Sequence, residues 1–216
     1  MIKNKDFIEI DYTGFTSEGQ VFDTTNKEIA KKNEFKEGDY SPLIICVGRG
    51  HILPGLDSKL EGLKVGKHKI TLSEHEGFGK KDPKKLKLMP MKLFAKQNIK
   101  PFVGLELNID DQLGVVRNIS GGRVIVDFNH PLAGKPVSYE VEIIRKVDDK
   151  KEQIQGLLKV LSIPTNKVEV EKDQLKIKTG IEVPNQLQDI LNKEIQETMN
   201  TKAEFVFEKP KENKKV

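Results

Sequence analysis

Apolar and polar residues alternate in three well-separated segments of the chain, which is the pattern of half-buried strands. These segments are residues 7–14, 67–72 and 137–147, and residues 42–47 add a strand that is apolar throughout. Leu56, Leu60 and Leu63 recur at the spacing of one helix face, so a short helix is predicted there. Together these elements predict a sheet that packs on one short helix.

Two stretches interrupt this pattern. Residues 24–40 form a long polar segment, predicted to be a functional flap or a mobile loop with a helical turn near Ile29. Residues 81–127 mix apolar residues with lysines and continue into three short strand patterns at 105–109, 114–119 and 123–127. The second stretch predicts a compact all-β insert, which at about 45 residues is marginal as an independent fold.

The C-terminal third has a pattern of its own. Residues 148–155 are highly charged and predict a linker, and two short strands follow at 168–170 and 175–178. A helix is predicted after Pro184, because apolar residues form a stripe on one face, and a last strand is predicted at 203–207. The stripe consists of Leu187, Ile190, Leu191, Ile195 and Met199. This order predicts a small ββαβ unit.

The predicted fold class is therefore α+β. The sheet and its helix would form a discontinuous domain of residues 1–80 and 128–150, interrupted by the insert at 81–127. The ββαβ domain would span 151–209, and the charged tail at 210–216 is predicted to be disordered.

Composition narrows the function classes. The 216 residues carry a net charge of +4, spread without a dense basic patch, so no nucleic-acid partner is predicted. Cys46 is the single cysteine and lies in a buried-strand pattern, which favours a core residue over a reactive thiol. No apolar run approaches the length of a membrane span, so a cytoplasmic protein without a membrane partner is predicted. The four histidines show no zinc-ligand spacing, so no metal site is predicted.

A set of short motifs, taken in order, resembles the FKBP domain of peptidyl-prolyl isomerases. The motifs are Val21-Phe22-Asp23, Ile52-Leu53-Pro54-Gly55-Leu56 and Gly77-Phe78-Gly79, with Tyr12 before them and Tyr139 after them. Residues 129–135 are similar to the segment that follows the inserted domain in SlyD-type FKBPs. The chain as a whole resembles the long archaeal form with an extra C-terminal domain, and the resemblance covers roughly residues 6–146.

The resemblance implies a half β-barrel wrapped on the short helix, with a shallow apolar pocket. Leu56 would form its floor, Asp23 would be a carboxylate at its rim, and the backbone N–H of Ile52 would donate to a substrate carbonyl. The residues implied in catalysis are Tyr12, Phe22, Asp23, Leu43, Ile52, Leu53, Leu56, Phe78, His130 and Tyr139. From periodicity alone, the aromatic residues among them would be assigned to the barrel core.

The implied activity is the acceleration of X-Pro isomerisation in unfolded or nascent polypeptides, with no cofactor. The chain departs from the family pattern at Leu56, where Trp is common, and at Phe78, where Tyr is usual. Its Lys-, Glu- and Asn-rich tail also lacks the His- and Cys-rich metal-binding segment of many SlyD proteins. An alternative prediction is therefore a holdase-type chaperone with weak or no isomerase activity.

The insert resembles the insert-in-flap domain of the family, which implies that it binds unfolded segments. The residues expected on its binding surface are Met89, Met91, Leu93, Phe94 and Phe102. Without the resemblance, strand spacing favours the core of the insert for the same residues. A homodimer through the C-terminal domain is a further hypothesis, because the apolar helix stripe needs burial and the unit that carries it is small.

Overall fold

A computed structural model describes residues 1–171 and 174–207. The chain divides into two compact units, Met1–Thr71 with Ser138–Val216, and Leu72–Val137. The second unit is wider than the predicted insert, and the predicted C-terminal domain belongs to the first unit. The predicted disordered tail lies outside the described residues.

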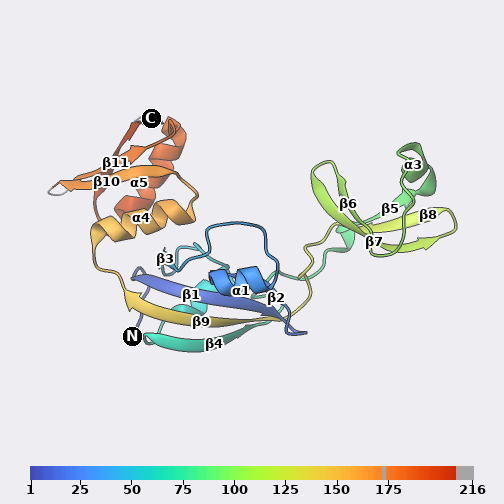
Figure 1. The fold of residues 1–216 in the computed structure, drawn as a ribbon, viewed down its shortest axis with the longest axis horizontal. Coiled ribbons are helices and arrows are strands. Elements are labelled where there is room, and N and C mark those ends of the chain that lie inside the picture. Colours follow the sequence, from blue (N-terminus) through green and yellow to red (C-terminus); the bar gives the residue numbers. More distant parts are fainter. Residues whose placement is uncertain (172–173, 208–216) are drawn as a thin grey trace, which may run out of the picture. The chain divides into compact units, whose positions relative to one another are not determined.

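The first unit contains a five-stranded sheet in the order β2-β1-β9-β4, with β3 also paired to β1 (Figure 1). Its strands are β1 (Phe7–Thr16), β2 (Val21–Thr24), β3 (Leu43–Cys46), β4 (Gly66–Leu72) and β9 (Val137–Lys146). Both β2 and β3 run antiparallel to β1. The α+β fold class and the predicted strands are confirmed.

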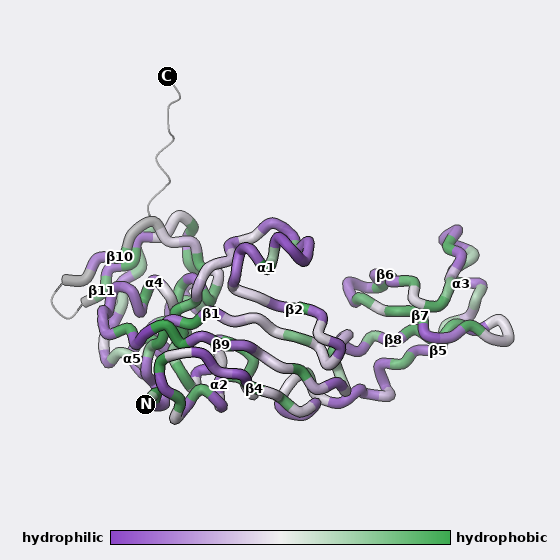
Figure 2. The backbone as a smooth tube through the Cα atoms, turned by 60° about the horizontal axis from the view of Figure 1, so that its bottom comes forward, coloured by the Kyte–Doolittle hydropathy of each residue, from purple (hydrophilic) through white to green (hydrophobic). Residues whose placement is uncertain are grey.

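Two short helices accompany this sheet. In α2 (Pro54–Leu60), a proline opens the helix, and Leu56 and Leu60 belong to the buried core. α1 (Lys27–Lys32) lies in the polar segment predicted as a flap or loop, and its hydrophilic character is visible in Figure 2. It begins at Asn26, whose side chain accepts hydrogen bonds from the first backbone N–H groups of the helix.

The C-terminal part of the first unit has the predicted ββαβ order, preceded by a further helix. Its elements are α4 (Lys150–Val160), β10 (Thr165–Glu171), β11 (Gln174–Thr179), α5 (Asn185–Met199) and β12 (Lys202–Phe207). β11 pairs antiparallel with β10 and parallel with β12. The charged linker predicted at 148–155 is wrong from residue 150 onward, because α4 begins there with Asp149 as its N-cap.

The C-terminal domain packs directly on the sheet. Ile154, Leu157 and Leu158 of α4 are fully buried in a core that also contains Phe7 and Cys46. The two latter residues are paired across β1 and β3, so one face of these strands is covered by the C-terminal domain. Cys46 is thus a core residue, and its burial, together with the charge of Glu194, raises its thiol pKa to about 12.

The second unit contains a four-stranded antiparallel sheet in the order β5-β8-β7-β6. Its elements are a 3₁₀ turn (Pro83–Lys85), β5 (Leu86–Pro90), α3 (Met91–Lys96), β6 (Glu106–Ile109), β7 (Gln112–Ser120) and β8 (Arg123–Asp127). The three predicted strands are confirmed. The all-β description is wrong in one respect, because α3 follows β5 and places Phe94 in the core with Val116, Val124 and Val126.

A buried carboxylate, that of Asp127, helps to join the two chain segments at the base of this sheet, residues 81–82 and 127–129. Asp127 accepts hydrogen bonds from the backbone and side-chain N–H groups of Asn129, at 3.0 and 2.8 Å, and pairs with Lys81 at 3.1 Å. The Asn129 amide in turn bonds both backbone groups of Asp82. Burial opposes ionisation of Asp127, but the Asn129 hydrogen bonds and Lys81 outweigh it and lower its pKa to about 2.

The second unit should therefore lose stability in acid. The pKa of Asp127 is lower in the folded state than its ordinary value of 3.8, so its contribution is complete above that pH and is lost as the pH falls toward about 2. We expect Asp127→Asn to remove on the order of 2 kcal/mol of this pH-dependent stability, measured by denaturant unfolding between pH 2 and 6. Asp110→Asn, in an exposed turn, is the control. If the stability of the two variants depended on pH in the same way, the proposed contribution of Asp127 would be contradicted.

Candidate active site

Three of the predicted aromatic residues meet in the first unit. Tyr12 of β1 and Tyr139 of β9 have ring centroids 5.9 Å apart, and Phe22 of β2 lies 5.6 Å from Tyr139. Both pairs are edge-to-face, at 68° and 82°, an arrangement that suits the aromatic quadrupoles. Tyr139 is buried, whereas Tyr12 and Phe22 are partly exposed. The three strands thus build an apolar wall that a ligand can reach.

Gly14 provides the space in which these rings meet. A Cβ atom at this position would lie 2.8 Å from Phe22 Cζ and 2.9 Å from Tyr139 Cε1, which is closer than real Cβ contacts. Sequence reasoning missed Gly14 as a site residue. A glycine inside a strand often marks a close approach, so the signal was present.

Asp23 lies at the edge of this group. Burial raises the pKa of Tyr12 well above its ordinary value, and the charge of Asp23 and its hydrogen bond with the Tyr12 side chain raise it further. Burial and the same carboxylate also raise the pKa of Tyr139. Both phenols therefore keep their protons at neutral pH and can act as hydrogen-bond donors. The hydrogen bond with Tyr12 places the Asp23 carboxylate where it can orient the Tyr12 side chain.

A tight turn precedes the predicted backbone donor. Gly48 and Gly50 have positive φ angles of 80° and 69°, which favour glycine. Their backbone N–H groups donate to the two carboxylate oxygens of Asp57, at 2.9 and 2.8 Å. Ile52 and Leu53 follow directly and are partly buried. Asp57, 2% exposed, is a second residue that sequence reasoning missed, because its partners are backbone groups without a motif of their own.

The remaining predicted residues lie on several elements. Leu56 is 1% exposed on α2, and Leu43 is partly buried on β3, where it pairs with Ile10. Phe78 and His130 belong to the second unit, where their rings stack with centroids 4.4 Å apart and planes within 3°. Partial burial and Lys85 lower the pKa of His130.

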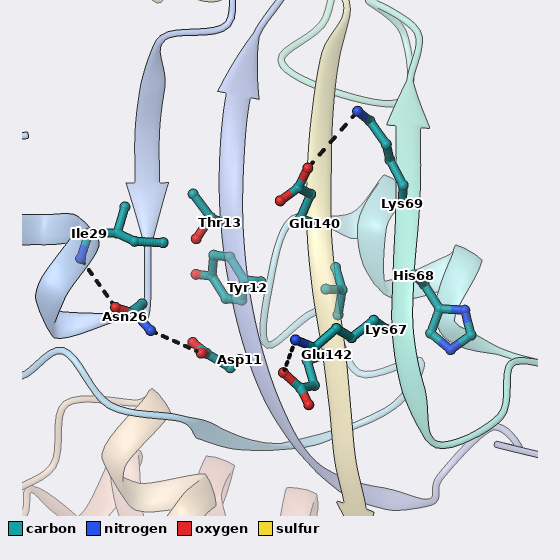
Figure 3. A pocket seen from close by; sticks show the side chains of 11 residues that line it. Asp11, Tyr12, Thr13, Asn26, Ile29, Lys67, His68, Lys69, Glu140 and Glu142 are labelled. Carbon is teal, nitrogen blue, oxygen red and sulfur yellow. Dashed lines mark hydrogen bonds and ion pairs between the residues drawn. The ribbon is translucent and has the colours of Figure 1, made fainter.

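The outer face of the first-unit sheet has a hollow of about 490 Å³, shown in Figure 3. Its rim is charged, with lysines of β4 paired to glutamates of β9 at 3.7 and 4.0 Å. Tyr12 is among the residues that line this hollow, but adjacent residues of a strand alternate between faces, so its ring lies on the opposite face of β1 from the side chains of Asp11 and Thr13. The aromatic group therefore belongs to the other face of the sheet.

Among residues 1–171 and 174–207, no group of three or more His, Cys, Asp or Glu side chains could hold a metal ion. Within the same ranges, no helix is long and apolar enough to cross a membrane.

Comparison with known proteins decides what this site belongs to. The model of the FKBP-type peptidyl-prolyl cis-trans isomerase family matches residues 1–95, and the model of the FKBP26 IF domain matches residues 87–132. A probable FKBP-type 16 kDa isomerase of Pseudomonas fluorescens is 36% identical over 112 residues, which cover 49% of this chain and 73% of the relative. The chain belongs to the FKBP-type peptidyl-prolyl cis-trans isomerases.

Two further relatives support the FKBP assignment. A short-type peptidyl-prolyl cis-trans isomerase of Methanocaldococcus jannaschii is 29% identical over 146 residues, covering 66% of this chain and 92% of the relative. The FKBP-type isomerase SlyD of Aeromonas hydrophila is 30% identical over 139 residues, covering 63% of this chain and 60% of the relative. The resemblance stated from the motifs is confirmed. The alternative of a holdase-type chaperone with weak or no isomerase activity stays a prediction.

The geometry suits an FKBP isomerase because the reaction needs no nucleophile. Rotation about an X-Pro bond must break amide resonance, a barrier of about 18–20 kcal/mol for a peptide bond. The twisted amide is less dipolar than the planar one, so an apolar wall of aromatic rings favours the transition state over the ground state. Hydrogen-bond donors at the edge of the wall can hold the chain while the bond turns.

Proposed function

We propose that this FKBP isomerase acts on unfolded or nascent polypeptides with exposed X-Pro bonds, and that its insert binds apolar segments of the same polypeptides as a chaperone. The observation that favours the second part is an unusual surface on the second unit. Large apolar side chains are exposed there on strands, on α3 and in loops. They are Leu86, Leu88, Leu93, Phe102, Val103 and Leu113.

These exposed apolar side chains overlap only in part with the binding surface predicted for the insert. Leu93 and Phe102 belong to both, and Phe102 is 61% exposed. Phe94 is corrected to a core residue, because it is 3% exposed and packs against the sheet of the insert. Met89 and Met91 are partly buried against the same core. The flexible, polarizable side chain of Met91 still lines a hollow of about 540 Å³ beside α3, which suits varied apolar ligands.

A binding surface on the same chain as an isomerase site raises the local concentration of substrate. Two linked sites turn the second binding step into an intramolecular one, so weak apolar binding by the insert is enough to increase the rate on long substrates. A tetrapeptide offers one X-Pro bond and no further apolar segment for the insert to bind, so its isomerisation should not depend on the insert.

This difference provides the test. The triple variant Leu88→Thr, Phe102→Ser and Val103→Thr should slow proline-limited refolding of a protein client by about tenfold relative to the parent chain. Its kcat/KM on a proline tetrapeptide should stay unchanged. The variant should also lose the suppression of aggregation of a proline-free client. Val65→Thr, an exposed apolar residue of the first unit, is the matched control. Refolding catalysis equal to that of the control would refute the proposed role of the insert.

The predictions about oligomeric state, cellular location and nucleic-acid binding remain predictions. A homodimer through the C-terminal domain has mixed support: Leu191, Ile195 and Met199 of the α5 stripe are buried within the chain, whereas Ile190 is 65% exposed. The mass of the chain in solution would decide it. A cytoplasmic location and the lack of a nucleic-acid partner are kept as predictions.

A further inference from the structure

The turn before Ile52 is held from two sides. On one side, the Asp57 carboxylate accepts both glycine N–H groups of the turn, as described above. On the other side, the Arg49 side chain, between the two glycines, reaches α5 of the C-terminal domain. The residues joined by this second contact are about two thirds of the chain apart in sequence.

The contact of Arg49 with α5 has a specific geometry. Its Nε donates to Glu194 Oε1 at 2.7 Å and its Nη2 donates to Glu194 Oε2 at 2.5 Å, the two-pronged arrangement that guanidinium and carboxylate prefer. Nη2 also donates to Glu197 Oε2 at 2.7 Å. Glu194 and Glu197 lie three residues apart on α5 and therefore share one face of the helix. The hydrogen bonds that Arg49 donates to both carboxylates raise its pKa, so its charge is permanent.

His51 extends the same contact toward the site. Its Nδ1 accepts the backbone N–H of Cys46 at 3.1 Å, so the proton of the neutral ring is on Nε2. Nε2 lies 3.9 Å from Glu194 Oε1. Burial lowers the pKa of His51, which keeps the ring neutral at physiological pH. Every residue from Gly48 to His51 thus has a partner outside the turn.

The helix that carries the two glutamates is itself fixed. A neighbouring face of α5 places Leu191, Ile195 and Met199 in the core that the C-terminal domain shares with Phe7 and Cys46. Cys46 ends β3 shortly before the turn. The sheet, α5 and the turn therefore form one packed structure, in which the guanidinium position depends on the C-terminal domain.

We propose that Glu194 and Glu197 are positioning residues for the isomerase site. By holding Arg49, they fix the turn of residues 48–51 and with it the direction of the Ile52 backbone N–H. The inference rests on the predicted role of this N–H as donor to the substrate carbonyl, and it gives the C-terminal domain a part in catalysis. A small misplacement of a group that holds the substrate costs rate even when the chemistry lies elsewhere.

The test uses the full-length protein and a proline tetrapeptide. The double variant Glu194→Gln and Glu197→Gln, and separately Arg49→Gln, should each lower kcat/KM by about threefold to tenfold. All three substitutions together should lower kcat/KM no more than the double variant or Arg49→Gln does alone, because each of them removes the same contact. Arg49→Lys keeps the charge but not the two-pronged geometry, so its kcat/KM should lie between that of the parent and that of Arg49→Gln. Glu182→Gln with Asp189→Asn, two exposed residues of the same domain, matches the charge change as a control.

The amide signal of Ile52 in a ¹⁵N-labelled protein separates positioning from stability. Adding the peptide should shift this signal in the parent and in the control, and the shift should shrink in the double variant. If the parent signal does not respond, the donor role of Ile52 fails, and the positioning proposal fails with it. If the parent responds and the double variant matches the control in shift and in kcat/KM, the positioning proposal alone is refuted. A loss of activity that is additive and leaves the Ile52 shift unchanged would also overturn it. None of these outcomes depends on client binding by the insert.

Discussion

Replacing Gly14 with alanine should remove most of the isomerase activity while the chain still folds. The added methyl group would lie within 3 Å of both Phe22 and Tyr139, so at least one ring must leave its position. Overpacking of this kind typically costs about 1–3 kcal/mol of stability, which a folded domain can tolerate. The wall that favours the twisted amide would be distorted, and we expect kcat/KM on a proline tetrapeptide to fall by about tenfold or more.

The control for this experiment is Gly38→Ala. A Cβ atom at Gly38 would lie 3.4 Å from Tyr40 Cε2, near ordinary contact distance, and the residue is exposed in a loop. Both variants should be compared by magnetisation-transfer NMR of the peptide and by thermal unfolding. Full activity of Gly14→Ala would show that the aromatic group is not the catalytic wall.

The second large effect is expected where α4 packs on the sheet. A Cβ atom at Gly156 would lie 2.4 Å from Ile44 Cβ and 2.9 Å from the Ile44 backbone oxygen, so α4 and β3 would have to separate. Alanine improves helix propensity by about 1 kcal/mol over glycine, but this gain is smaller than the cost of opening a buried interface. We expect Gly156→Ala to destabilise the first unit by about 2–4 kcal/mol.

The single thiol provides a direct measurement of this separation. Cys46 is fully buried in the core shared with α4, so reagents reach it when the C-terminal domain moves away. Gly156→Ala should label faster than the parent chain, whereas Gln155→Ala, exposed on the same helix, should label at the parent rate. Unchanged labelling and unfolding in Gly156→Ala would mean that the packing of α4 on β3 is looser than described.

The fold was predictable where the residue pattern is local. Alternation located the strands of the sheet, and the leucine spacing located α2, although this helix ends at Leu60 and leaves Leu63 outside it. The prediction failed at α4 because Lys150, Lys151 and Glu152 fill its first turn, which is exposed or partly exposed. The apolar face of this helix, formed by Ile154, Leu157 and Leu158, starts late and extends beyond the predicted linker.

The site was predictable from ordered motifs but not from single residues. Tyr12, Phe22 and Tyr139 have no pattern that separates them from core residues, and the surrounding motifs indicated their shared location. Asp57 and Glu194 escaped prediction for another reason: their partners lie in a turn whose geometry depends on glycine backbone angles. A contact between Arg49 and a helix about 145 residues later leaves no periodic signal in the sequence.

The discontinuity of the first unit determines the order in which a new chain can fold. β9 follows the insert in the sequence, yet it lies between β1 and β4 in the sheet. During synthesis, β1 can pair with β2 and β3, but β4 has no partner strand until the whole insert and β9 have left the ribosome. The strands of the insert pair with near neighbours in sequence, and such local contacts form early. The segment proposed to bind unfolded polypeptides thus emerges before the isomerase sheet is complete, and the nearest unfolded chain at that moment is its own N-terminal part.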